Sequence, residues 1–132
     1  MNQNQKQSKE PIIIYVDTGI ANIIGDCIFL HKSLQQPKYK AYHDYLLAHE
    51  KEHFNNRQGK HNHTADFLTD LFTGFKHFFT NLEFIWHNKG AWQQLAPVRL
   101  IRDPRDKEPA LIFDAFTMAA WAIVITLLVV YL

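Results

Sequence analysis

The chain has 132 residues, with 14 lysine and arginine residues against 13 aspartate and glutamate residues and a formal net charge of +1. This length leaves room for one folded domain, and the balanced charge gives no reason to expect a nucleic acid as a partner. The single cysteine, Cys27, excludes an internal disulfide, which fits a reducing compartment.

The first quarter of the chain is predicted to form a polar leader followed by short strands. Residues 1–11, MNQNQKQSKEP, have no apolar stretch, so we expect them to be disordered and not to act as a signal peptide. The run PIIIYVDTG is rich in β-branched residues and ends in a turn signal, which predicts a short strand. A turn at Gly25 and Asp26 then precedes a second predicted strand, Cys27–His31.

Helical spacing dominates the middle of the chain. A first helix is predicted over about residues 38–55, just after a proline, where apolar and aromatic side chains recur with helical period. The loop NNRQGKHNHT separates it from a second helix that begins at Thr64 and whose pattern Gly74 interrupts. A short third helix is predicted at Lys89–Leu95, which completes a folded domain over residues 12–97.

The last part of the chain is a charged segment followed by a long uncharged, apolar one. We expect residues 98–110 to be a charged linker, and residues 111–132 contain the uncharged run AFTMAAWAIVITLLVVYL. A helix of that length covers about 27 Å, close to the thickness of a bilayer core, so we predict a single transmembrane anchor there. The alternative is a buried terminal helix. Basic residues precede the span, so the positive-inside rule places the folded domain in the cytoplasm.

The stretch AYHDYLLAHEKEHFNN carries an H-E-x-x-H motif made of His49, Glu50 and His53. Residues four apart on a helix share a face, so both histidines can reach one ion. Zinc accepts imidazole nitrogen, and a catalytic site combines three protein ligands with a water that a neighbouring carboxylate can deprotonate. The spacing therefore predicts two zinc ligands and, in Glu50, a catalytic base. The alternative is an amphipathic helix that is merely rich in histidine.

Candidates for the third ligand lie downstream, in the segment DFLTD. Asp66 and Asp70 are again four apart on a predicted helix, so one carboxylate can bind the metal while the other accepts the second N–H of a ligand histidine. Glu83 is a competitor for the third position. The alternative is that Asp66 is only a favourable charge at a helix start and Asp70 a solvated residue.

The segment GDCIFLHKSLQQPKYKAYHDYLLAHEKEHF resembles the core of the zincin metallopeptidases, within the gluzincin clan, and among these the minigluzincins. The resemblance implies an α+β fold, a mainly helical minidomain with a short edge-stranded sheet, to which the transmembrane helix is added. It implies His49 and His53 as zinc ligands and Glu50 as the base. Gluzincins take their third ligand from the glutamate of an E-x-x-x-D pattern, and Asp66 stands at that position here, with Asp70 as supporting residue and Glu83 as competitor.

The function expected from the sequence is that of a small, membrane-anchored zinc metallopeptidase. In zincins the peptide substrate adds to an edge strand, which the resemblance places at residues 28–30, made of Ile28, Phe29 and Leu30. The small size leaves a second hypothesis open, a latent or non-catalytic accessory subunit of a membrane protein complex. A third hypothesis is a metal-delivery protein that uses the loop histidines His61 and His63.

Overall fold

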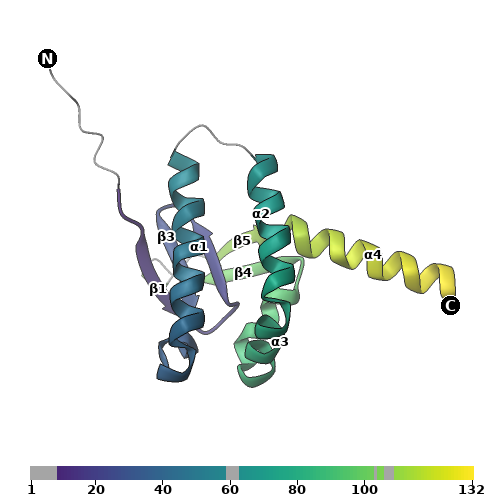
Figure 1. Cartoon of the computed structure of the whole chain (residues 1–132), viewed down its shortest axis with the longest axis horizontal. Coiled ribbons are helices and arrows are strands. Elements are labelled where there is room, and N and C mark those ends of the chain that lie inside the picture. Colours follow the sequence, from purple (N-terminus) through teal and green to yellow (C-terminus); the bar gives the residue numbers. More distant parts are fainter. Residues whose placement is uncertain (1–8, 59–62, 103, 106–108) are drawn as a thin grey trace, which may run out of the picture.

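Two small sheets and four α-helices make up the described part of the chain, which is α+β and mainly helical (Figure 1). The structure is a computed structural model that describes residues 9–58, 63–102, 104–105 and 109–132. The side chains of residues 57–58, 63–67, 69, 71 and 115–116 are not described. The predicted disordered leader, residues 1–11, lies mostly outside these ranges.

The larger sheet has three strands: β1 (Ile12–Val16), β2 (Ala21–Ile24) and β3 (Cys27–His31). The strand order is β1-β3-β2, with β3 parallel to β1 and antiparallel to β2. Gly25 turns the chain between β2 and β3 at a φ of 56°, a conformation that favours glycine. The predicted strand Cys27–His31 is confirmed, whereas β2 was not foreseen.

The predicted edge position of residues 28–30 is wrong. β3 is the central strand, bonded to β1 on one side and to β2 on the other, and all five of its residues are buried. Its backbone groups are therefore already paired, and no peptide can add to it. The edges of this sheet are β1 and β2.

Helix α1 (Lys40–Gln58) packs on one face of the sheet and is reached through two short 3-10 helices, η1 (Lys32–Gln35) and η2 (Pro37–Tyr39). Side chains alternate across a strand, so β3 sends Ile28 and Leu30 to this face. They join Leu46 of α1 and Phe84 of helix α3 (Phe78–His87) in the larger core cluster. This packing fixes α1, and with it the H-E-x-x-H motif, against the sheet.

The other face of the sheet is covered by a hairpin of β4 (Val98–Arg102) and β5 (Pro109–Phe113). Ile101 of β4 packs against Ile14, Cys27 and Phe29 in a second core cluster. Residues 98–110, expected to be a charged linker, thus contribute β4 and the start of β5.

Two further helices lead from α1 towards this hairpin. Helix α2 (His63–Lys76) is separated from α3 by a break at His77, three residues beyond the glycine that interrupts the sequence pattern. The predicted helix Lys89–Leu95 is confirmed as a 3-10 helix, η3. Figure 1 shows α1 and α2 running side by side in front of the strands.

The predicted transmembrane anchor at residues 111–132 is wrong. Residues 111–113 belong to β5, and the final helix, α4, comprises only 17 residues, Ala115–Tyr131, whose start is fixed by the Asp114 side chain accepting the backbone N–H of Thr117. A bilayer core requires about 20 apolar helical residues. Among the described residues, no helix is both long and apolar enough for a membrane span, which also overturns the predicted membrane location and orientation.

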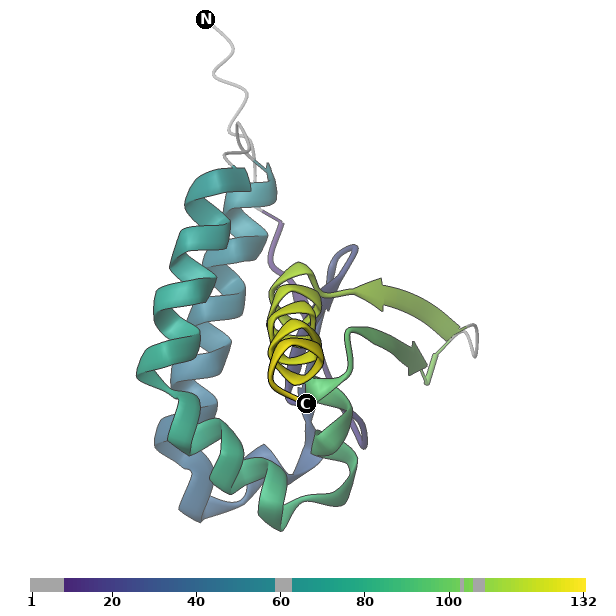
Figure 2. The ribbon, with the colours of Figure 1, turned by 90° about the vertical axis from the view of Figure 1, so that its right-hand side faces the viewer.

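Helix α4 is not a buried terminal helix either. It contacts α2 near its start, and every residue from 118 to 132 is exposed. Figure 2, which looks along α4, shows the β4–β5 hairpin on one side of it and the α1–α2 pair on the other.

Candidate metal centre

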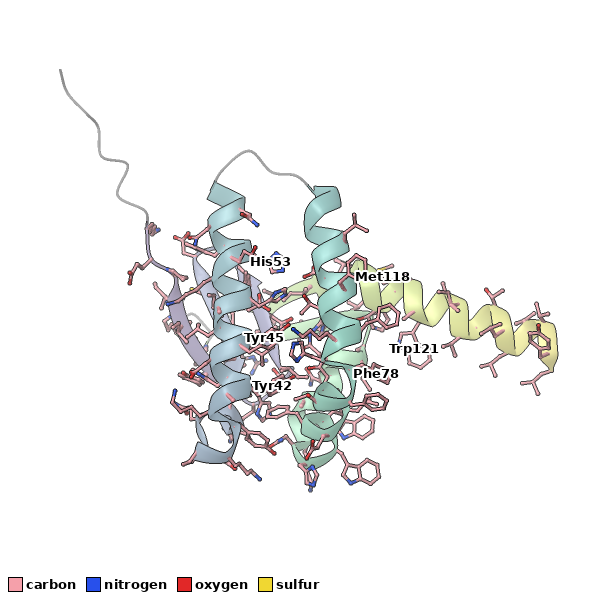
Figure 3. The ribbon with its side chains drawn as sticks, viewed as in Figure 1. Tyr42, Tyr45, His53, Phe78, Met118 and Trp121 are labelled. Atoms are coloured by element: carbon pink, nitrogen blue, oxygen red, sulfur yellow. The ribbon has the colours of Figure 1, made fainter. Side chains whose placement is uncertain are left out.

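His49, His53 and Asp70 meet in the space between α1 and α2 and form the candidate metal group. The two histidines lie one turn apart on α1, both half-buried, with their Nε2 atoms 3.0 Å from each other. Asp70 approaches from α2, and its Oδ1 lies 2.7 Å from Nε2 of His53 and 3.2 Å from Nε2 of His49. Figure 3 shows His53 pointing from α1 towards α2.

The donor atoms of this group fit a small divalent cation. Two imidazole nitrogens and one carboxylate oxygen lie within 4.8 Å of one another, and this is a ligand set that zinc accepts. Bonds of about 2.0 Å to a tetrahedral ion place ligand atoms roughly 3.3 Å apart, so the side chains need to separate by roughly 0.1 to 0.6 Å. A tetrahedral zinc ion held by these three side chains would have a fourth position for another ligand.

The charge state of Asp70 suits a metal ligand. Burial raises the pKa of this carboxyl, but hydrogen bonds and charge from His49 and His53 outweigh burial and hold the pKa of Asp70 well below its usual value. Asp70 is therefore ionised at neutral pH, as a ligand must be.

The other predicted site residues have different outcomes. Asp66 lies in α2, but its side chain is outside the described residues, so its assignment as third ligand stays a prediction. Asp70, expected only to support a ligand histidine, is the carboxylate that lies against both histidines. Glu83 is exposed on α3, where its backbone carbonyl accepts a hydrogen bond from His87, and it is not part of the metal group.

Glu50 stands beside the metal group on α1 and is half-buried. Burial raises the pKa of Tyr45, and the negative charges of Glu50 and Asp70 raise it further. The charge of Glu50 also acts on the buried guanidinium of Arg99, from β4.

Two aromatic side chains next to the metal group were missed by the sequence reasoning. The ring of Tyr45 stacks on His77 with a centroid separation of 3.8 Å and lies 6.2 Å from the ring of His49. Tyr45 could have been found, because it precedes His49 by four residues on the same helix face. His77 could not, because its position depends on the break between α2 and α3.

Comparisons of this chain with protein families, with curated proteins and with solved structures gave no match.

Proposed function

We propose that this chain is a small zinc metallopeptidase whose metal is held between α1 and α2. One observation carries the proposal: an H-E-x-x-H helix brings His49 and His53 against an ionised carboxylate, Asp70, from a second helix. The sequence predicted the histidine pair and left the third ligand open between Asp66 and Glu83, with Asp70 as a supporting residue. The third donor supports a site with three protein ligands, which is the number that catalytic zinc sites use.

Each residue then has a distinct task. When bound, zinc polarises the peptide carbonyl and lowers the pKa of a bound water to about 7. His49, His53 and Asp70 hold the ion, and Asp70 offsets part of its charge. Glu50, adjacent to a ligand in the chain, accepts the proton of the attacking water on its carboxylate and returns it to the leaving amide nitrogen.

The peptide substrate needs a place other than β3. Strand β2 is an edge of the sheet and contacts α1, whereas β3 is closed on both sides. In this proposal the substrate adds to β2 as a further strand, so that main-chain hydrogen bonds hold it beside the catalytic helix.

Replacement of Glu50 by Gln tests the proposal. The amide cannot accept a proton, so the variant should retain one zinc per chain while cleavage of fluorescein-labelled casein falls by about 100-fold or more. Zinc is measured by atomic absorption and cleavage by released fluorescence. Glu52→Gln is the matched control, because Glu52 is an exposed glutamate of the same helix, and this change should leave both quantities unaltered.

A wild-type chain that binds no zinc, or a Glu50→Gln variant as active as the wild type, would contradict the proposal.

A second candidate function is an accessory subunit that keeps the metal site but does not catalyse. It is favoured by the exposure of large aromatic side chains on α2 and α3: Phe72, Phe75, Phe79 and Trp86 each expose more than 70% of their surface. A surface of this kind is typical of a site where another protein binds. Stoichiometric zinc in a wild-type chain that cleaves no casein would select this function over the first.

A further inference from the structure

The ring of Tyr45 lies beside the metal group, and the proposed chemistry has not used it. It stacks on the ring of His77 with a centroid separation of 3.8 Å. It is also nearly parallel to the ring of His49, with 6.2 Å between the centroids and 16° between the planes. Tyr45 belongs to α1, whereas His77 directly follows α2. The stack therefore joins the two helices that supply the metal ligands.

Helical spacing puts this stack on the same helix faces as the metal ligands. Tyr45 precedes His49 by four residues, so both lie on one face of α1. The backbone N–H of His77 still donates to the carbonyl of Thr73, so His77 continues the last turn of α2. Asp70 stands seven residues before His77, which is about two turns, and therefore lies on the same side of α2. The metal group and the stack are thus two successive contacts between the same pair of helices.

The large apolar side chains of α2 do little to hold this helix in place. Among those that the structure describes, Leu68 exposes 45% of its surface, and Phe72 and Phe75 each expose 71%. A helix that packs on its neighbour normally buries a stripe of such side chains. The two stacked rings therefore supply a contact between α1 and α2 that these three side chains do not.

His77 takes part in this contact through the face of its ring. Its Nε2 atom is buried and has no hydrogen-bond partner in the part of the chain that the structure describes. His77 is also not a member of the metal group, which consists of His49, His53 and Asp70. Ring contact, rather than a bond from Nε2, is therefore what His77 provides to Tyr45.

We propose that Tyr45 and His77 are positioning residues of the metal centre. This inference rests on the proposed function, because it concerns the site that holds the zinc. Tyr45 limits the rotation of the His49 ring, so that Nε2 of His49 stays turned towards Asp70. The stack with His77 holds α2 at the distance at which Asp70 reaches the two histidines. A site whose ligands are already held in place binds its metal more tightly, because less ordering accompanies binding.

The experiment measures the zinc affinity of the full-length chain by competition with a chromophoric chelator. The visible absorption spectrum of the cobalt(II)-loaded chain reports the geometry of the ligands. Tyr45→Leu and His77→Ala each remove one ring of the stack, so each should weaken zinc binding by about 10-fold to 100-fold and alter the cobalt spectrum. Tyr45→Phe and His77→Phe keep both rings, so they should bind zinc within about threefold of the wild type and retain its cobalt spectrum.

A second tyrosine–histidine stack on α1 provides the matched control. The ring of Tyr15, from β1, lies 6.0 Å from the ring of His43 with 18° between the planes, which is close to the geometry of Tyr45 and His49. His43 is not a member of the metal group. Tyr15→Leu also removes the hydrogen bond between the Tyr15 hydroxyl and Nε2 of His43. It should therefore lower the melting temperature and leave the zinc affinity and the cobalt spectrum unchanged.

The outcomes separate this inference from the proposed function. A wild type that binds no zinc overturns both, and one that binds zinc but cleaves no casein overturns the peptidase function alone. A zinc-binding wild type whose affinity is unchanged in Tyr45→Leu or in His77→Ala overturns the inference alone. If one of these variants does not fold, the other decides.

Two further results would also overturn the inference. If His77→Phe weakens zinc binding as much as His77→Ala, then His77 acts through a nitrogen atom and not through ring contact. If Tyr15→Leu weakens zinc binding as much as Tyr45→Leu, then the loss follows from general destabilisation of α1 and not from the position of the ligands.

Discussion

Large apolar side chains are buried on the sheet side of the molecule and exposed on the opposite side, which is formed by α2, α3 and α4. Around the sheet, Ile28, Phe29 and Phe84 are each exposed by 2% or less. On α2, Phe72 and Phe75 each expose 71%. Figure 3 shows Phe78, Met118 and Trp121 on this second side, where α2, α3 and α4 come together.

The difference shows that apolar composition does not decide burial. α1 is the more polar helix, yet its Leu46 is buried, because Leu30 of the sheet and Phe84 of α3 belong to the same core cluster. α4 is apolar on every face and is exposed, because it contacts the rest of the chain only near its start. Burial requires a second layer, and among the described residues only the sheet side has one.

Replacement of Phe84 by Ala should have the largest effect on stability. The ring of Phe84 is 1% exposed and meets His31, Tyr39 and Tyr42 in the core, so its removal leaves a cavity. The free energy of unfolding, measured by urea denaturation, should fall by about 3–5 kcal/mol.

The matched control is Phe79→Ala, five residues earlier on α3 and 81% exposed, which should change the free energy of unfolding by less than about 0.5 kcal/mol. Equal losses of unfolding free energy in the two variants would mean that the exposed side is covered in solution. This result would contradict the difference in burial between the two sides.

The metal centre lies between the two sides, and its two candidate carboxylates provide the next test. Asp70→Asn should abolish the gain in stability that zinc gives the wild type, which amounts to about 2.7 kcal/mol at a zinc concentration 100 times the Kd. Asp66→Asn, one turn earlier on α2, should retain most of that gain if Asp70 is the ligand. Thermal unfolding with and without zinc measures both effects. The reverse result would restore the assignment of Asp66 that the sequence resemblance favours.

Local sequence patterns predicted what lies on the sheet side. The strand Cys27–His31 was found because a turn signal at Gly25 and Asp26 precedes it, and α1 was found because apolar side chains recur there at helical spacing. The pair His49 and His53 followed directly from the spacing on α1. These features depend on residues close together in the chain.

The misplaced features depend on distant residues. The sequence PALIF before α4 is as apolar as α4 itself, and a short apolar run does not distinguish a strand from a helix; it becomes β5 because β4 pairs with it. Cys27–His31 is central rather than an edge because it pairs with β1 as well as with β2. Asp66 and Asp70 share a helix face, so only the placement of α2 against α1 brings Asp70 to the histidines.

The smallest predicted effect concerns a polar side chain on the packed side, His31 at the end of β3. It is 4% exposed, its Nδ1 accepts the backbone N–H of Ser33, and its ring meets Phe84 edge-on. Burial lowers the pKa of His31 below its usual value, although Asp17 acts in the opposite direction. The folded chain therefore favours the neutral ring, whereas the unfolded chain takes up a proton near pH 6.5.

The free energy of unfolding should thus decrease as the pH falls below about 6.5, with up to about 1.4 kcal/mol per pH unit from this residue, and His31 should contribute no slope well above that pH. Urea denaturation of the metal-free wild type and of His31→Asn, from pH 5 to 8, isolates this contribution, because the other histidines contribute equally to both curves. The difference in free energy of unfolding between the wild type and His31→Asn should be constant above pH 7 and should decrease below pH 6.5. The reason is that the variant lacks the imidazole ring that takes up a proton on unfolding. Parallel curves over the whole range would contradict the prediction and show that burial on the packed side does not disfavour a charge on His31.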